Sequence, residues 1–244
     1  METMDVRVGG PLRYERLAVF PLFLSASDAV AYRLGSEAIR TGTLAIERNP
    51  AGSSIQLTVE NRDDARVLLL AGESLPGNSA STACNRSVLL PARSKIEILA
   101  KYLEPTRERT VAGKHGGMGL SGANLAEFKR RLAYVDQASG FVTAIARQIV
   151  AVELLDLPPV CQSIWDRMIG ELASAARATP CPGWARILDV QRLLLALSRA
   201  PWQRMETAGE GDLHRAELPD AARASSLSLD GHLIQLSCLL TRMF

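Results

Sequence analysis

A polar insert between two apolar runs constrains the fold of this chain more than any other feature. Val67–Leu70 and Val88–Leu90 have the content of short buried strands. The residues between them, 71–87, are mostly small or polar and include Glu73 and Asn85. Small residues and glycine turns let the backbone of such a loop come close to a ligand. We therefore expect two buried strands that carry a candidate ligand-binding loop.

Strand signals continue on both sides of this insert. In Ile55–Glu60 every second residue is apolar, which is typical of a half-buried strand. Asn61–Asp64 has the composition of a tight turn. The sequence therefore predicts a continuous antiparallel meander over residues 43–103, within a β-rich region that covers residues 12–103.

Helical signals lie before and after the predicted meander of residues 43–103. Ser27 and Asp28 supply an N-cap for a helix over Ala29–Thr41, and Gly42 would end it. Val142–Leu155 reads as a pair of strands, and Asp230-Gly231 is a typical hairpin turn. We expect three further helices, at residues 124–137, 158–178 and 185–198, and one closing hairpin at residues 224–240.

The order of these elements predicts an α+β fold, because strands come first, helices follow and a hairpin returns at the end. We expect mostly antiparallel sheets with the helices packed on one side. A chain of 244 residues forms one large domain or two small ones. The prediction adopted is a single compact domain over residues 1–244.

Composition excludes several classes of partner. The formal net charge is +2, which gives no field strong enough to attract nucleic acid or an anionic membrane. Leu17–Leu24 is too short to span a bilayer, and no signal peptide is visible. The four cysteines show no CxxC spacing, which favours free thiols in a reducing cytoplasm over a zinc site. A disulfide between Cys161 and Cys181 is the alternative.

No motif announces a reaction. The chain lacks GxxxxGK[ST], GxSxG and HExxH, so none of these motifs names a cofactor. Its three histidines are far apart, and no metal site is expected. The glycine-rich segment Lys114–Gly119 is either a concavity of amide groups that suits an anion or an ordinary surface loop.

Two carboxylates follow apolar strands, where functional side chains are frequent. Glu73 follows Val67–Gly72, and Asp156 follows Ile149–Leu155. Partly desolvated acids at these places could act as a general base or bind a cation. The alternative is a structural role, as a turn residue for Glu73 and as the cap of the next helix for Asp156.

Cys84 is a candidate nucleophile in the same polar insert. Arg86 could supply the positive field that a reactive thiolate needs. No histidine can be assigned as its base, so a buried, unreactive thiol is the favoured interpretation.

Five segments of the chain, in this order and spacing, resemble the ARG and rhodanese-phosphatase-superfamily-associated protein domain family over nearly the whole length. They are PLRYERLAVFPLF, LTVENRDDARVLLLAGESL, NRSVLLPARSKIEI, IVAVELLDLPPVCQSIWDRMIGEL and SLSLDGHLIQLSCL. The resemblance implies a compact α+β domain. The family's association with ADP-ribosylglycohydrolases implies a setting in nucleotide or ADP-ribose metabolism.

The resemblance also implies site residues. The family's polar pattern is retained at Glu73, Asn85, Glu104 and Arg107. A Lys-Gln-Asn-Arg run of the family is replaced here by Ser79, Ala80, Ser81 and Thr82. A common tryptophan is replaced by Glu108, and a frequent histidine position holds Gln235.

Two hypotheses follow. In the first, the protein is an enzyme that acts on a nucleotide-linked, ADP-ribosyl or other phosphorylated small molecule. Glu73 or Glu104 is then the acid or base, and Arg107 holds an anionic group. Asn85 and Asp156 then contact the substrate. In the second, the protein is a catalytically degenerate member that binds a ligand or serves as an accessory subunit. A protein partner or a homo-oligomer is compatible with both.

Overall fold

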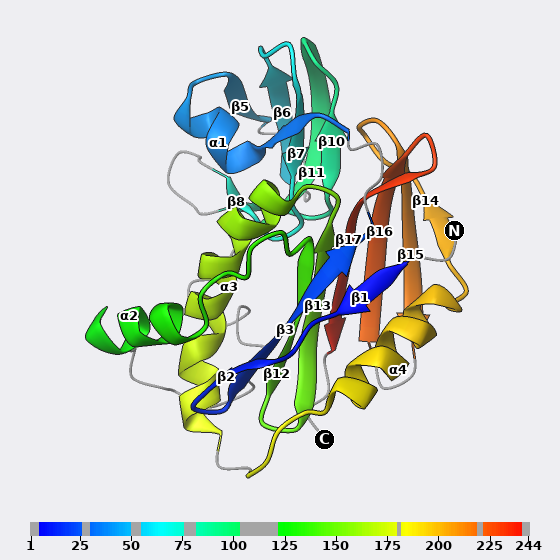
Figure 1. Ribbon diagram of the computed structural model, residues 1–244. Coiled ribbons are helices and arrows are strands. Elements are labelled where there is room, and N and C mark those ends of the chain that lie inside the picture. The colour runs from blue at the N-terminus through cyan, green and yellow to red at the C-terminus, as the bar shows by residue number, and fades with distance from the viewer. Residues whose placement is uncertain are drawn as a thin grey trace. The chain divides into compact units, whose positions relative to one another are not determined.

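The computed structural model describes residues 5–25, 30–49, 55–75, 82–102, 122–179, 182–218 and 222–240 (Figure 1). The chain packs into two units, and each is built from segments that are distant in the sequence. Unit 1 comprises Met1–Ala29, Arg109–Arg204 and His214–Phe244. Unit 2 comprises Val30–Glu108 and Met205–Leu213.

A nine-stranded antiparallel sheet forms the body of unit 1. Its strand order is β1-β3-β12-β13-β17-β16-β15-β14, and β2 pairs with β3. These strands are β1 (Val6–Val8), β2 (Leu12–Tyr14), β3 (Leu17–Leu24), β12 (Gly140–Ile145), β13 (Gln148–Leu155), β14 (Gln203–Met205), β15 (Asp212–Leu218), β16 (Ala222–Leu229) and β17 (His232–Leu240). The hairpins predicted over Val142–Leu155 and residues 224–240 are confirmed as β12–β13 and β16–β17.

Three helices belong to unit 1: α2 (Gly122–Arg131), α3 (Pro158–Ala178) and α4 (Ile187–Ser198). The predicted bounds of α3 are confirmed, and Pro158 occupies its first turn, where a proline costs no hydrogen bond. The helix expected over residues 124–137 instead ends at Arg131. Gln137 has a φ of 61°, which is incompatible with a helix.

The helices α3 and α4 cover opposite faces of this sheet, so the prediction that all helices pack on one side was wrong. Trp165 of α3 contacts the ring of Phe141 edge-on, at 5.2 Å between centroids. Val190 of α4 belongs to the apolar cluster that contains Val142. Neighbouring residues of a strand point to opposite faces, so Phe141 and Val142 mark two different faces. Every residue of β12 is buried, which requires cover on both sides.

Unit 2 contains two small sheets. A five-stranded antiparallel sheet has the order β5-β6-β11-β9-β8, and a three-stranded sheet has the order β10-β7-β4. The elements of this unit are β4 (Tyr32–Leu34), α1 (Gly35–Arg40), β5 (Leu44–Asn49), β6 (Ile55–Asn61), β7 (Arg66–Leu69), β8 (Ser74–Leu75), β9 (Thr82–Cys84), β10 (Val88–Leu90) and β11 (Ser94–Tyr102). One apolar cluster joins the sheets, with Leu57 and Ile98 from the larger and Leu69 and Leu90 from the smaller.

This arrangement corrects two predictions. The single helix expected over Ala29–Thr41 is a strand, β4, followed by the short helix α1. Tyr32 and Leu34 are buried on either side of an exposed Arg33, because β4 pairs in parallel with β7. The meander expected over residues 43–103 is interrupted, because β7 and β10 leave the larger sheet and pair with each other.

No helix in the described part of the chain has both the length and the apolar content needed to cross a membrane.

Candidate functional site

Unit 2 contains a hollow of about 100 Å³ in which Asn85 is a lining residue; we call it the Asn85 hollow. Its walls come from the turn between β9 and β10, from β11 and from the segment that precedes β15. The lining residues are Asn85, Arg86, Ser87, Val88, Glu97, Ile98, Leu99, Glu206, Thr207, Ala208 and Leu213. Polar side chains from two distant parts of the chain therefore face one small volume.

The first wall is the turn between β9 and β10, which hydrogen bonds hold on both sides. The Asn85 N–H donates to the Leu99 carbonyl of β11 at 3.3 Å. The buried Cys84 thiol donates to the Arg86 carbonyl at 2.7 Å. The Ala71 N–H donates to the buried Ser87 hydroxyl at 3.0 Å. Because the backbone is held in this way, the exposed side chains of Asn85 and Arg86 start from defined positions.

The second wall is a segment from the C-terminal half of the chain. Glu210 donates its N–H to the Leu89 carbonyl at 2.8 Å, and its carboxylate pairs with Arg66. Gly209 allows this approach, because a Cβ there would lie 2.2 Å from the Leu89 carbonyl oxygen. Sequence reasoning missed this wall, since no local pattern links residues 206–208 to Asn85.

The rim of the hollow can recognise an anion and hydroxyl groups. Arg86 is its cation, and Glu97 and Glu206 are its carboxylates. The Arg86 Nη1 donates to the Glu206 carbonyl at 3.3 Å, which is a long hydrogen bond. Asn85 and Thr207 add an amide and a hydroxyl, and the buried lining residues other than Ser87 are apolar.

Cys84 is not a nucleophile in this arrangement. Burial raises the pKa of its thiol to about 12, although hydrogen bonding with the Arg86 backbone opposes the rise. The thiol is therefore protonated at neutral pH, and a neutral thiol reacts slowly.

Glu73 points into the interior of unit 2. Its Oε2 accepts the Leu70 N–H at 2.9 Å, and its own N–H donates to the Leu70 carbonyl at 3.0 Å. Gly35 lies against the carboxyl group, so that a Cβ at this position would be 3.3 Å from Oε2. The described lining of the Asn85 hollow does not include Glu73. The structure therefore does not bring the Glu73 and Asn85 side chains together.

The remaining predicted site residues lie elsewhere. Asp156 belongs to unit 1, where it connects β13 to α3 and donates its N–H to the Ile234 carbonyl at 3.2 Å. The N-cap of α3 is Leu157, without a side-chain cap, so Asp156 does not cap this helix. Glu104 and Arg107 lie outside the described residues, as does the Lys114–Gly119 segment.

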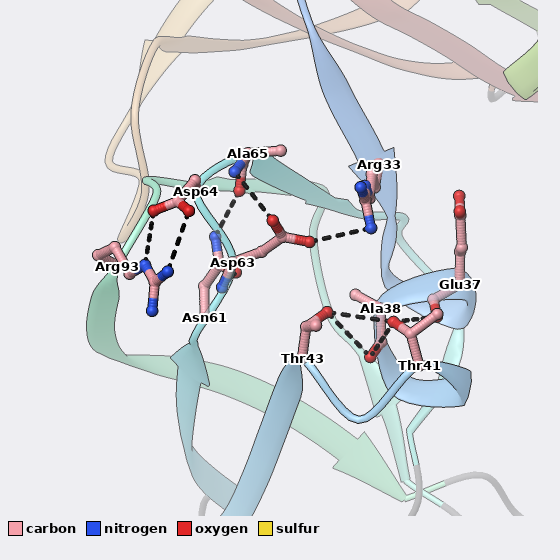
Figure 2. Close-up of polar contacts among 10 residues, drawn as sticks. All are labelled: Arg33, Glu37, Ala38, Thr41, Thr43, Asn61, Asp63, Asp64, Ala65 and Arg93. Carbon is pink, nitrogen blue, oxygen red and sulfur yellow. Dashed lines mark hydrogen bonds and ion pairs between the residues drawn. The ribbon is translucent and has the colours of Figure 1, made fainter.

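A second polar group in unit 2 surrounds the turn between β6 and β7 (Figure 2). The buried Asn61 donates from Nδ2 to the Ala65 carbonyl at 2.9 Å and to the Pro91 carbonyl at 2.7 Å. Asp63 pairs with Arg33 at 3.1 Å, and Arg93 binds the Asp64 carboxylate with two nitrogens (Figure 2). These polar groups pair with one another, so the group stabilises the turn.

No three His, Cys, Asp or Glu side chains among the described ranges are grouped as a metal site requires. Comparison with known proteins gives one positive result. The model of the ARG and rhodanese-phosphatase-superfamily-associated protein domain family matches residues 5–102 and 120–239. No curated protein and no solved structure matches the chain.

Proposed function

The chain belongs to the ARG and rhodanese-phosphatase-superfamily-associated protein domain family, and we propose that it binds a phosphorylated, ribose-containing small molecule at the Asn85 hollow. The ligand class is nucleotide-linked or ADP-ribosyl. The observation that carries this proposal is that Arg86, Asn85, Glu97 and Thr207 line one small hollow.

Each rim group has a part of such a ligand to recognise. The planar guanidinium of Arg86 can donate two parallel hydrogen bonds to a phosphate. Carboxylates such as Glu97 accept hydrogen bonds from ribose hydroxyls, as acidic residues do in dinucleotide sites. The lining residue Leu99 is 50% exposed, and its apolar side chain suits the carbon face of a sugar. Because the hollow is only about 100 Å³, it holds one ribose-phosphate portion while the rest of the ligand lies outside.

Arg86 can reorient toward a phosphate at little cost. Its guanidinium donates a 3.3 Å hydrogen bond to the Glu206 carbonyl, and the side chain is exposed. A long hydrogen bond at an exposed site contributes little stability, so an anionic ligand can replace it.

Binding is favoured over acid–base catalysis among the described residues. In the enzymatic hypothesis, Glu73 would have to leave the Leu70 N–H and reach a ligand on the surface. Glu73 is 4% exposed, and its departure would leave a buried donor without an acceptor. Arg86 and Asn85 need no such rearrangement to bind a ligand.

The test is a binding titration by calorimetry with ADP-ribose, ribose 5-phosphate and inorganic phosphate. Arg86→Gln is compared with Arg62→Gln, which removes an exposed arginine that pairs with the neighbouring Glu60. We expect ADP-ribose and ribose 5-phosphate to bind, and Arg86→Gln to weaken binding by about tenfold, or 1.4 kcal/mol. Arg62→Gln should bind like the wild type. No binding of any of the three compounds, or equal binding by both variants, would overturn the proposal.

A further inference from the structure

One wall of the Asn85 hollow is an irregular segment that precedes β15. We call residues 206–210 the Glu210 segment, and it belongs to unit 2. Its first three residues line the hollow, whereas the described lining includes neither Gly209 nor Glu210. The contacts of these last two residues therefore decide where the three lining residues lie.

The backbone of the Glu210 segment is attached to β10. Glu210 and Leu89 form an isolated antiparallel bridge, in which the Glu210 N–H donates to the Leu89 carbonyl at 2.8 Å. The two chains come very close at Gly209. A Cβ there would lie 2.2 Å from the Leu89 carbonyl oxygen and 2.8 Å from Cγ1 of Val88. Any other residue at position 209 would therefore displace the segment from β10.

The side chain of Glu210 is attached to the neighbouring strand. Its half-buried carboxylate accepts a hydrogen bond from Nε of Arg66 on β7. The antiparallel partner of β7 is β10 (Figure 1), so Glu210 contacts two adjacent strands of one sheet, β10 through its backbone and β7 through its side chain. A charge-assisted hydrogen bond is stronger than one between neutral groups. Glu210 is therefore the firmly held end of the segment.

The contacts toward the other end of the segment are weaker. The hydrogen bond from Arg86 to the Glu206 carbonyl is 3.3 Å long, and a bound phosphate would replace it. The Thr207 hydroxyl oxygen accepts the Gly209 N–H, also at 3.3 Å. Because an accepting hydroxyl keeps its own hydrogen, Thr207 can donate to a ligand in the hollow. Once Arg86 turns to the ligand, the position of this hydroxyl depends on Gly209 and Glu210.

We propose that Glu210, held by Arg66, is a positioning residue of the Asn85 hollow that places the Thr207 hydroxyl without touching the ligand. This role rests on the proposed function, which gives Thr207 a ligand to contact. Linkage makes the effect reciprocal. A ligand that binds more tightly when the segment lies on β10 must also stabilise the hydrogen bond between Glu210 and Leu89. A residue that only stabilised the fold would not respond to the ligand in this way.

The attachment of the segment is measured without ligand, as hydrogen exchange of the Glu210 amide corrected for the intrinsic rate. Exchange requires that this N–H leaves the Leu89 carbonyl. We expect Arg66→Gln to speed the exchange about fivefold and Arg66→Lys, which keeps a cation, to speed it less. Arg62→Gln, at an exposed pair of the same unit, should leave it unchanged. Glu210→Gln combined with Arg66→Gln should give no further increase, because both remove the same contact.

The effect on the ligand is measured with ADP-ribose. Gly209→Ala displaces the segment and should weaken ADP-ribose binding about tenfold in calorimetry. Glu210→Gln should weaken it in the same direction, and it serves as the test if Gly209→Ala does not fold. The matched control is Gly10→Ala, because a Cβ at Gly10 meets no described atom within 4 Å. Saturating ADP-ribose should slow exchange of the wild-type Glu210 amide about tenfold.

The outcomes distinguish the role of Glu210 from the proposed function. If ADP-ribose does not bind the wild type while Arg66→Gln speeds the exchange, the proposed function is overturned and the attachment of the segment through Glu210 is supported. Three results would overturn the role of Glu210. They are unchanged exchange in Arg66→Gln, full ADP-ribose affinity in Gly209→Ala, and wild-type Glu210 exchange that bound ADP-ribose does not slow.

Discussion

Removal of the Glu73 side chain tests whether this carboxyl group holds the turn that leads into the candidate loop. In the structure Glu73 and Leu70 exchange two hydrogen bonds, of 2.9 and 3.0 Å. Glu73→Ala removes the first of these and leaves the Leu70 N–H without this acceptor in the interior. Leu70 is 4% exposed, so water cannot readily replace the carboxylate.

The expected cost follows from that burial. A buried donor that loses its acceptor costs about 1–3 kcal/mol, and the space left by the side chain adds to this. We therefore expect Glu73→Ala to lower the free energy of unfolding by about 2 kcal/mol or more. Glu73→Gln keeps an oxygen that can accept the Leu70 N–H, and it should cost about half as much.

Urea unfolding followed by tryptophan fluorescence and circular dichroism measures these differences. The matched control is Glu47→Ala, which removes an exposed glutamate of β5 in the same unit. It should change the free energy of unfolding by less than about 0.5 kcal/mol. If Glu73→Ala is as stable as this control, Glu73 does not hold the turn, and the argument that it is occupied structurally fails.

Three further predictions concern stability and reactivity. Asn61→Ala removes three hydrogen bonds of a 1% exposed side chain and should lower the free energy of unfolding in urea by about 3 kcal/mol. Arg93→Gln, at an exposed ion pair, should have a much smaller effect. The free energy of unfolding should fall as pH rises from 5 to 8, because desolvation of the half-buried Glu153 on β13 raises its pKa to about 7 in the folded protein, while the unfolded group releases its proton near 4.5. Glu153→Gln should remove this slope; a wild-type stability that is flat or rising over this range contradicts it. Cys84, Cys161 and Cys238 are buried, so in a Cys181→Ser variant the native protein at pH 8 should not react with a thiol reagent until urea unfolds it. Fast labelling of the native protein would refute the burial of these three cysteines.

Elements with local signals could be predicted from the sequence. Pro158 at the start of α3 and the Asp230-Gly231 turn are set by φ preferences of the residues themselves, and Asp230 and Gly231 both have positive φ. The residues of β4 could not be assigned in this way. Their spacing fits a helix, but pairing with β7, more than thirty residues later in the chain, makes them a strand.

The difference between local signals and long-range contacts also explains which residues of the candidate site could be predicted. Asn85 could be selected because it lies in a polar loop beside a buried strand. Its neighbours Glu206 and Thr207 could not, because long-range contacts such as that of Glu210 with Leu89 bring their segment to the hollow. Glu153 offered a weaker signal, since it is the one charged residue within the apolar run of β13. Reading that interruption as a half-buried carboxyl group requires the partner strand β17, which the sequence of β13 does not reveal.

The most direct test of the central claim is an NMR titration of uniformly ¹⁵N-labelled protein with ADP-ribose. The account predicts that the amide of Asn85, the guanidinium of Arg86 and the amide of Thr207 shift together along one saturable curve, and that Arg86→Gln weakens that curve about tenfold. Saturable shifts that leave these three groups unchanged, or no shifts at all, would contradict it.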